Sequence, residues 1–110
     1  GNENDGVLRY EGNLVHGGTT TREMEWGPFE GLFICSSSAT QDSGTKFLGG
    51  TSAGATIKLQ QYINGVWVTF NNGAKTIHGG FQFITCADKI RVTVSNSAAG
   101  TDIFYRVQSI

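Results

Sequence analysis

The chain has 110 residues, enough for one domain, and a formal net charge of −1 from 8 Lys and Arg against 9 Asp and Glu. This balance argues against nucleic acid or an anionic membrane as a partner, because both need clustered positive charge. Charged residues are only 15% of the chain, whereas there are 16 Gly and 1 Pro. No apolar run reaches the ~20 residues of a membrane span. The composition favours a Gly- and Thr-rich β-protein that meets other proteins.

The N-terminal third carries few regular signals. Residues 1–6 are polar and without periodicity, which predicts a flexible arm ahead of a single domain over residues 7–110. A first short strand is predicted within residues 7–15, followed by a break at 17–21. Residues 22–30 are predicted as a loop or a poor edge strand. No segment has the i, i+3, i+4, i+7 apolar spacing of a helix.

From residue 31 onward the β signals are stronger. The apolar run 32–35 predicts a strand, and 36–54 is predicted to be mostly loop, with 46–48 as a candidate short strand. Residues 57–60 alternate with a period of two, as a half-buried strand does.

Asn64-Gly65 lies between two β-rich runs, which is the strongest short-range signal for a hairpin. Residues 66–70 are the predicted return strand, and Asn71-Asn72-Gly73 is predicted as another turn. A further strand is predicted over 81–86, and a tight turn at Ala87-Asp88.

The segment 89–95 alternates cleanly, with Ile90, Val92 and Val94 expected inward. A loop at 96–101 then precedes a last strand. That strand is predicted over 103–110. About six to eight short strands with frequent turns and no crossover helix predict an all-β fold, a single antiparallel β-sandwich or jelly roll.

The hairpin leaves two registers open. With a two-residue turn in perfect register, Tyr62 pairs with Trp67 on the face that carries Lys58 and Gln60, as a surface aromatic pair. With a bulge at Gln60-Gln61, Tyr62 and Trp67 turn to the core instead. Because large aromatic side chains are usually buried, we favour the core position.

Two cysteines, Cys35 and Cys86, allow one disulfide at most. They could pair across a sandwich or remain two buried thiols. No signal peptide is visible, so we expect reduced thiols. There is no C-x-x-C, and the histidines are His16 and His78, so no metal site is expected.

No set of residues predicts catalysis. Cysteines in apolar strands usually act as inert packing, and His78 stands before Gly79-Gly80, as expected of a turn. Acidic residues flank Trp26 and Phe29, but their spacing carries no signal for a carboxylate pair. No phosphate-binding or calcium-binding loop is present. We therefore expect neither an enzyme nor a cofactor. Trp26, Tyr62 and Trp67 could stack on sugar rings, as in a carbohydrate-binding module.

Residues 55–110 carry a pattern: Thr56–Tyr62, a turn with Asn64-Gly65, Trp67, the strand Lys89–Ser95, a small-residue loop Asn96–Thr101 and a terminal strand. It resembles small virion proteins of tailed bacteriophages, in which a "V-x-L-Q-x-S-x-D-G-x-x-W" hairpin precedes an "I-R-V-x-V-S" strand. Here the hairpin is shorter and has Asn-Gly for Asp-Gly. The resemblance covers about half of the chain. It implies a non-enzymatic sandwich, usually a homotrimer: a capsid decoration (cement) protein, a head-fibre base or a tail-associated protein.

The resemblance and the composition together predict a capsid decoration protein. It would be made in the host cytoplasm and located on the outer capsid surface of the virion, with the major capsid protein and itself, as a homotrimer, for partners. The alternative is a carbohydrate-binding or receptor-binding module of a tail or head fibre. The candidate partner-binding residues are Trp26, Pro28, Phe29, Tyr62 and Trp67.

Overall fold

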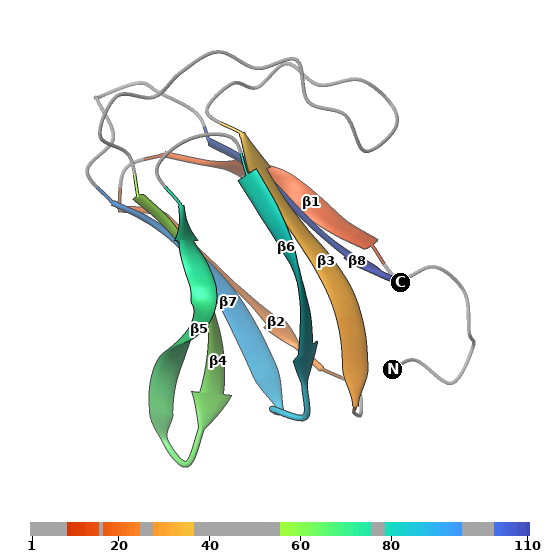
Figure 1. Ribbon diagram of the computed structural model, residues 1–110. Helices are drawn as coiled ribbons and strands as arrows, with labels where there is room; N and C mark the ends of the chain where they lie inside the picture. The colour runs from red at the N-terminus through yellow and green to blue at the C-terminus, as the bar shows by residue number, and fades with distance from the viewer. Residues whose placement is uncertain (1–8, 16, 25–27, 37–55, 76–78, 96–102) are drawn as a thin grey trace.

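The computed structural model describes residues 9–15, 17–24, 28–36, 56–75, 79–95 and 103–110. Within them, eight strands form two four-stranded antiparallel sheets that pack against each other (Figure 1). The strands are β1 (Arg9–Leu14), β2 (Thr19–Glu23), β3 (Phe29–Ser36), β4 (Thr56–Ile63), β5 (Val66–Lys75), β6 (Gly79–Thr85), β7 (Lys89–Ser95) and β8 (Ile103–Ser109). The predicted antiparallel β-sandwich is confirmed.

The strand order is that of a jelly roll. One sheet has the order β1-β8-β3-β6 and the other the order β2-β7-β4-β5. β4 and β5 form a hairpin, and outward from it along the chain β3 pairs with β6, β2 with β7 and β1 with β8. The chain therefore runs as one long antiparallel hairpin folded across itself, with successive strand pairs in opposite sheets.

Side chains that point inward from both sheets form the core. The alternation of β7 is confirmed, because Ile90, Val92 and Val94 are at most 3% exposed. Their neighbours on the same strand, such as Arg91, stay partly exposed. The other buried members of the core are Tyr10, Met24, Phe29, Phe33, Cys35, Ile57, Leu59, Phe83, Ile103 and Val107.

One strand was not predicted. Residues 19–21, expected to belong to a break, and residues 22 and 23, expected to begin a loop or a poor edge strand, together form β2 and pair with β7. β2 is an edge strand, and four of its five residues are exposed. A strand of this kind needs no apolar alternation, while its three threonines favour extended backbone.

One predicted turn is wrong. Asn71-Asn72-Gly73 lie within β5, which continues to Lys75. β5 pairs with β4 at Thr69, opposite Gln60, and again at Ala74, opposite Lys58, with a register shift between the two pairs. This polar segment therefore accommodates an irregularity inside a strand instead of reversing the chain.

Both cysteines are free thiols, as expected. Cys35 is buried and lies opposite Gly79 at the start of β6, whereas Cys86 follows the end of β6. The expectation that both are buried is wrong for Cys86, which is exposed because it lies beyond the strand, at the β6–β7 turn.

Several predicted segments lie outside the described residues: the arm 1–6, the loop 36–54 except Ser36, with its candidate strand 46–48, and the loop 96–101. In the part of the chain that the structure describes, no helix has the length and apolar character needed to cross a membrane.

Candidate functional site

The outer face of the β2-β7-β4-β5 sheet carries a partly exposed aromatic pair. Tyr62 lies directly opposite Trp67 in the β4–β5 ladder, with ring centroids 4.9 Å apart and an angle of 57° between the ring planes. Both side chains are partly exposed. The expected core position is therefore wrong, and the alternative register, with a surface aromatic pair, is the one that forms.

The reason lies in the register. β4 keeps strict alternation: Leu59 is fully buried, and the Oε1 atom of Gln61 accepts a 2.9 Å hydrogen bond from Thr85 of the opposite sheet. Gln60 and Tyr62 must then point outward. The irregularity lies between Lys58 and Gln60, before the aromatic residues, and so does not reverse their direction.

The turn holds this register. Asn64 and Gly65 have φ angles of 51° and 82°, both in the left-handed region that a two-residue hairpin turn needs. Ile63 and Val66 close the ladder on either side of the turn. The Asn-Gly pair thus places Tyr62 and Trp67 on one face.

Two cations from β7 lie over the aromatic pair. The Nζ atom of Lys89 is 4.4 Å from the ring centroid of Tyr62, and the guanidinium carbon of Arg91 is 4.3 Å from that of Trp67. Both distances are within the ~6 Å range of cation–π attraction. β7 is the neighbour of β4 in the sheet, which brings these residues together.

A hydrogen-bond chain braces Arg91. Its Nε atom donates to Gln60 Oε1 at 2.7 Å, and Gln60 Nε2 donates to Thr69 Oγ1 at 2.9 Å. The chain crosses three adjacent strands, so the guanidinium is fixed over the Trp67 ring. We define the aromatic–cation face as Gln60, Tyr62, Trp67, Thr69, Lys89 and Arg91.

The face has a positive balance. Among the described residues, its sheet also presents Lys58 and Glu23 outward. Neither Lys89 nor Arg91 forms an ion pair with a described acidic residue. Their described partners are thus the neutral side chains of Tyr62, Trp67 and Gln60, which leave the positive charge of the face in place.

The opposite side of the same hairpin is apolar. Ile63, Val66 and Val68 are 41%, 59% and 39% exposed, and we call them the hairpin flank. Figure 1 shows the β4–β5 hairpin reaching past the ends of the neighbouring strands. A pocket of about 400 Å³ separates the hairpin end from the β6–β7 turn at Cys86 and Asp88.

The other predicted site residues do not join this face. Trp26, like His16 and His78, lies outside the described residues. Pro28 is exposed just before β3. Phe29 is 2% exposed and packs on Phe83, with ring centroids 5.8 Å apart, in the core.

Sequence reasoning placed Gln60 beside the aromatic pair in one of the two registers, but it missed Lys89 and Arg91 as members of the site. The alternation of 89–95 already places Lys89 and Arg91 on the outer face. No local signal says that β7 lies beside β4, because Gln60 and Arg91 are 31 residues apart.

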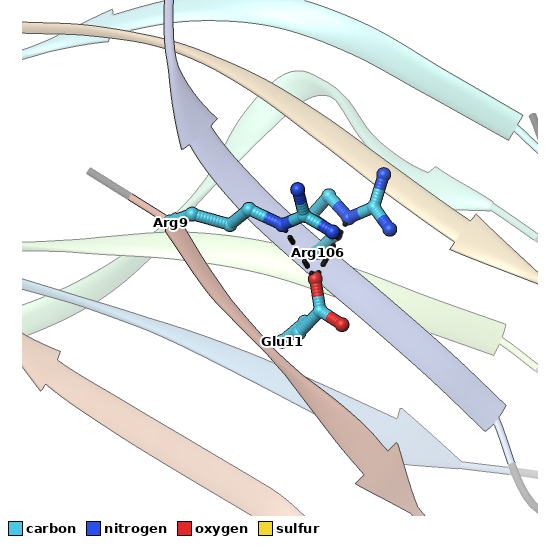
Figure 2. Close-up of polar contacts among 3 residues, drawn as sticks. All are labelled: Arg9, Glu11 and Arg106. Carbon is cyan, nitrogen blue, oxygen red and sulfur yellow. Dashed lines mark hydrogen bonds and ion pairs between the residues drawn. The ribbon is translucent and has the colours of Figure 1, made fainter. Parts of the chain in front are cut away.

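The outer face of the other sheet holds a charge network (Figure 2). Arg106 is fully buried, and its Nε atom lies 3.0 Å from Glu11 Oε1. The same oxygen accepts a 2.7 Å hydrogen bond from Arg9 Nε. Glu11 and Arg106 are opposite each other in the β1–β8 ladder, so the network ties the first strand to the last.

Among the residues that the structure describes, no group of three or more His, Cys, Asp or Glu side chains could hold a metal ion. Comparison of the chain with protein families, with curated proteins and with solved structures finds no match.

Proposed function

We propose that the chain is a non-enzymatic virion protein of a tailed bacteriophage, a capsid decoration protein that binds the outer capsid surface as a homotrimer. The observation that carries the proposal is the aromatic–cation face, where Tyr62, Trp67 and Arg91 lie together on a solvent-facing sheet. The pattern in residues 55–110 that resembles phage virion proteins supports the same function.

The chemistry of the face suits a protein partner. Trp, Tyr and Arg are the residue types that dominate the binding energy of protein interfaces. Arg91 is already held by Gln60, so docking would cost little further side-chain freedom. Jelly rolls occur in viral capsid and lectin domains, an analogy at the level of the fold that agrees with the proposal.

The mechanism would be stabilisation by selective binding. A protein that binds only the assembled shell stabilises it by mass action. Three linked copies would turn modest single contacts into strong attachment. The hairpin flank, with Val66 59% exposed, is suited to the contact between copies.

The test combines two measurements on the full chain. Light scattering gives its mass in solution, and co-sedimentation with phage shells that lack it gives shell binding. The proposal expects a trimer that sediments with assembled shells and not with free capsid protein. A monomer that stays in the supernatant would contradict it.

A second candidate is a carbohydrate-binding module that uses the same face. It rests on Tyr62 and Trp67, whose partly exposed rings lie beside polar groups of Gln60 and Thr69. Aromatic rings with adjacent hydrogen-bonding groups suit a sugar ring. A glycan screen separates the two candidates: a saturable glycan ligand, competed by the free sugar, together with no shell binding would favour this one.

A further inference from the structure

A second cavity opens between the two sheets at the edge formed by β1 and β2. It has a volume of about 250 Å³, and its lining includes Ile90, Arg91 and Val92 of β7. The core residues Ile90, Val92 and Val107 form an apolar floor, and Thr20 and Thr21 add polar groups to the lining. Tyr10, Tyr105 and Arg22 form its walls. We call it the inter-sheet pocket.

Arg22 bridges the two sheets at the mouth of this pocket. It lies opposite the buried Ile90 in the β2–β7 ladder, so it starts on the inward side of β2. Its guanidinium carbon is 4.1 Å from the ring centroid of Tyr10, which belongs to the other sheet. The Arg22 side chain is nevertheless exposed and forms no ion pair with a described residue.

The absence of a side chain at Gly12 leaves space for Tyr105, the second aromatic residue in the pocket wall. Gly12 lies opposite Tyr105 in the β1–β8 ladder, and a Cβ atom at Gly12 would be 3.0 Å from the Tyr105 hydroxyl oxygen. The tyrosine ring therefore lies across β1 where any other residue would crowd it. Tyr105 is also one of the residues that line the pocket.

We propose that the inter-sheet pocket binds a small organic anion, a carboxylate carried on a single ring or a short aliphatic body. The apolar floor suits the ring or aliphatic part of the ligand. The Arg22 guanidinium group suits the carboxylate, because the two groups form paired hydrogen bonds. A 150 Å³ apolar cavity already accepts benzene, so about 250 Å³ leaves room for a ring with a charged group.

The charge of the residues that line the pocket determines the sign of the ligand's charge. No acidic residue is among the described residues that line the pocket, whereas Arg22 and Arg91 are. The Arg91 side chain is committed to Trp67 on the outer face, which leaves Arg22 as the cation of the pocket. A neutral ligand of the same shape would lose the contact with Arg22 and bind more weakly.

The test is a titration of the full, ¹⁵N-labelled chain with benzoate, and separately with benzyl alcohol, at constant pH and ionic strength. The proposal expects saturable amide shifts for benzoate at Tyr10, Tyr105 and Val107, with contacts from the ligand ring to Val107 methyl groups. Benzyl alcohol should bind at least about tenfold more weakly.

Three variants complete the design, two of which remove one positive charge each. Arg22→Gln should weaken benzoate binding about tenfold or more, whereas Lys58→Gln, on the outer face of β4, should leave it within about twofold. Arg22→Lys should retain part of the affinity, since it keeps the charge and loses the paired hydrogen bonds. Equal binding of the two ligands, shifts that do not saturate, or shifts away from the pocket would overturn the proposal. So would an Arg22→Gln variant that binds benzoate as the native chain does.

Discussion

Tyr62 and Trp67 lie opposite each other in the β4–β5 ladder, with ring centroids 4.9 Å apart, and two cations from β7 lie over them, Lys89 nearest to Tyr62 and Arg91 nearest to Trp67. Aromatic pairs of this geometry stabilise a sheet by about 0.5–1.5 kcal/mol beyond the area that they bury. Because the rings are partly exposed, part of their surface remains available to a partner.

The first prediction concerns this pair. Trp67→Ala should lower shell binding by a factor of about 30 or more, as loss of a central aromatic contact does in protein interfaces. Its folding cost should stay near 1 kcal/mol, since the ring is partly exposed. Co-sedimentation gives the first quantity and urea unfolding the second. Gln82→Ala, on the outer face of the other sheet, is the control; equal shell binding by both variants would place the docking surface elsewhere.

The second prediction concerns the buried Arg106. Glu11→Gln keeps the shape of the side chain but removes the charge opposite a fully buried guanidinium. We expect a loss of about 1–3 kcal/mol in the free energy of unfolding, because a buried charge loses part of its compensation. Arg9→Gln removes the exposed partner of the same carboxylate and should cost less than about 1 kcal/mol. Urea unfolding measures both, and the reverse order of effects would contradict the assignment of Arg106 as the main partner.

The third prediction concerns the close packing at Gly31. A Cβ atom there would be 2.5 Å from a Phe29 ring carbon and 2.9 Å from Phe83. Gly31→Ala should therefore destabilise the chain by about 1–3 kcal/mol, the usual cost of overpacking a core. At Gly12 the nearest atom is the Tyr105 hydroxyl oxygen, at the end of a side chain that can move. Gly12→Ala should stay within about 1 kcal/mol of the native chain, because lower entropy of the unfolded chain offsets the crowding.

The fourth prediction concerns the Asn-Gly turn. Gly65→Ala puts a side chain at a φ of 82°, which should cost about 1–2 kcal/mol. Asn64→Gly meets the same backbone requirement and should change stability by only about 0.5–1 kcal/mol, through the greater freedom of the unfolded chain. The midpoint temperatures of thermal unfolding compare the stability of the two variants. If Gly65→Ala were the milder change, the left-handed turn would not be what holds the hairpin.

The fifth prediction concerns the thiols. A water-soluble disulfide reagent should modify Cys86 in the folded chain and reach the buried Cys35 only after unfolding in urea. The absorbance produced by Ellman's reagent should correspond to one reactive thiol per chain in buffer and to two in denaturant. Two equivalents in buffer would show that the Cys35 end of β3 opens readily.

Local sequence patterns predicted most of the strands. They failed where the structure of a segment depends on its pairing with a distant part of the chain. The alternation of β7 and the Asn64-Gly65 turn are local, and both predictions are confirmed. β2 was missed because an edge strand exposed on most of its length shows no alternation. The segment Asn71-Asn72-Gly73 was predicted as a turn but lies at an irregularity within β5. Its amino-acid composition suits a turn and a strand irregularity equally well, so it could not distinguish the two.

The candidate site was predicted in part. Tyr62 and Trp67 were identified as a pair, but the general preference of large aromatic side chains for the core favoured the wrong face. The register, set by the turn and by the alternation of β4, outweighs that preference. Arg91 could not be joined to Trp67, since only the pairing of β4 with β7 connects them. Similarly, nothing in the last strand indicated that Arg106 would be buried.

The pairing of β1 with β8 also constrains when the molecule can fold. In one sheet, β1 lies at the edge, and its neighbour is β8, the last of the described strands. During synthesis, β1 therefore cannot pair with β8 until on the order of 90 further residues have been added. The pairing of the two strands then closes a long loop. Completion of this sheet must follow release of β8 from the ribosome. Until then Tyr10 and the other inward side chains of β1 stay open to solvent or to a chaperone.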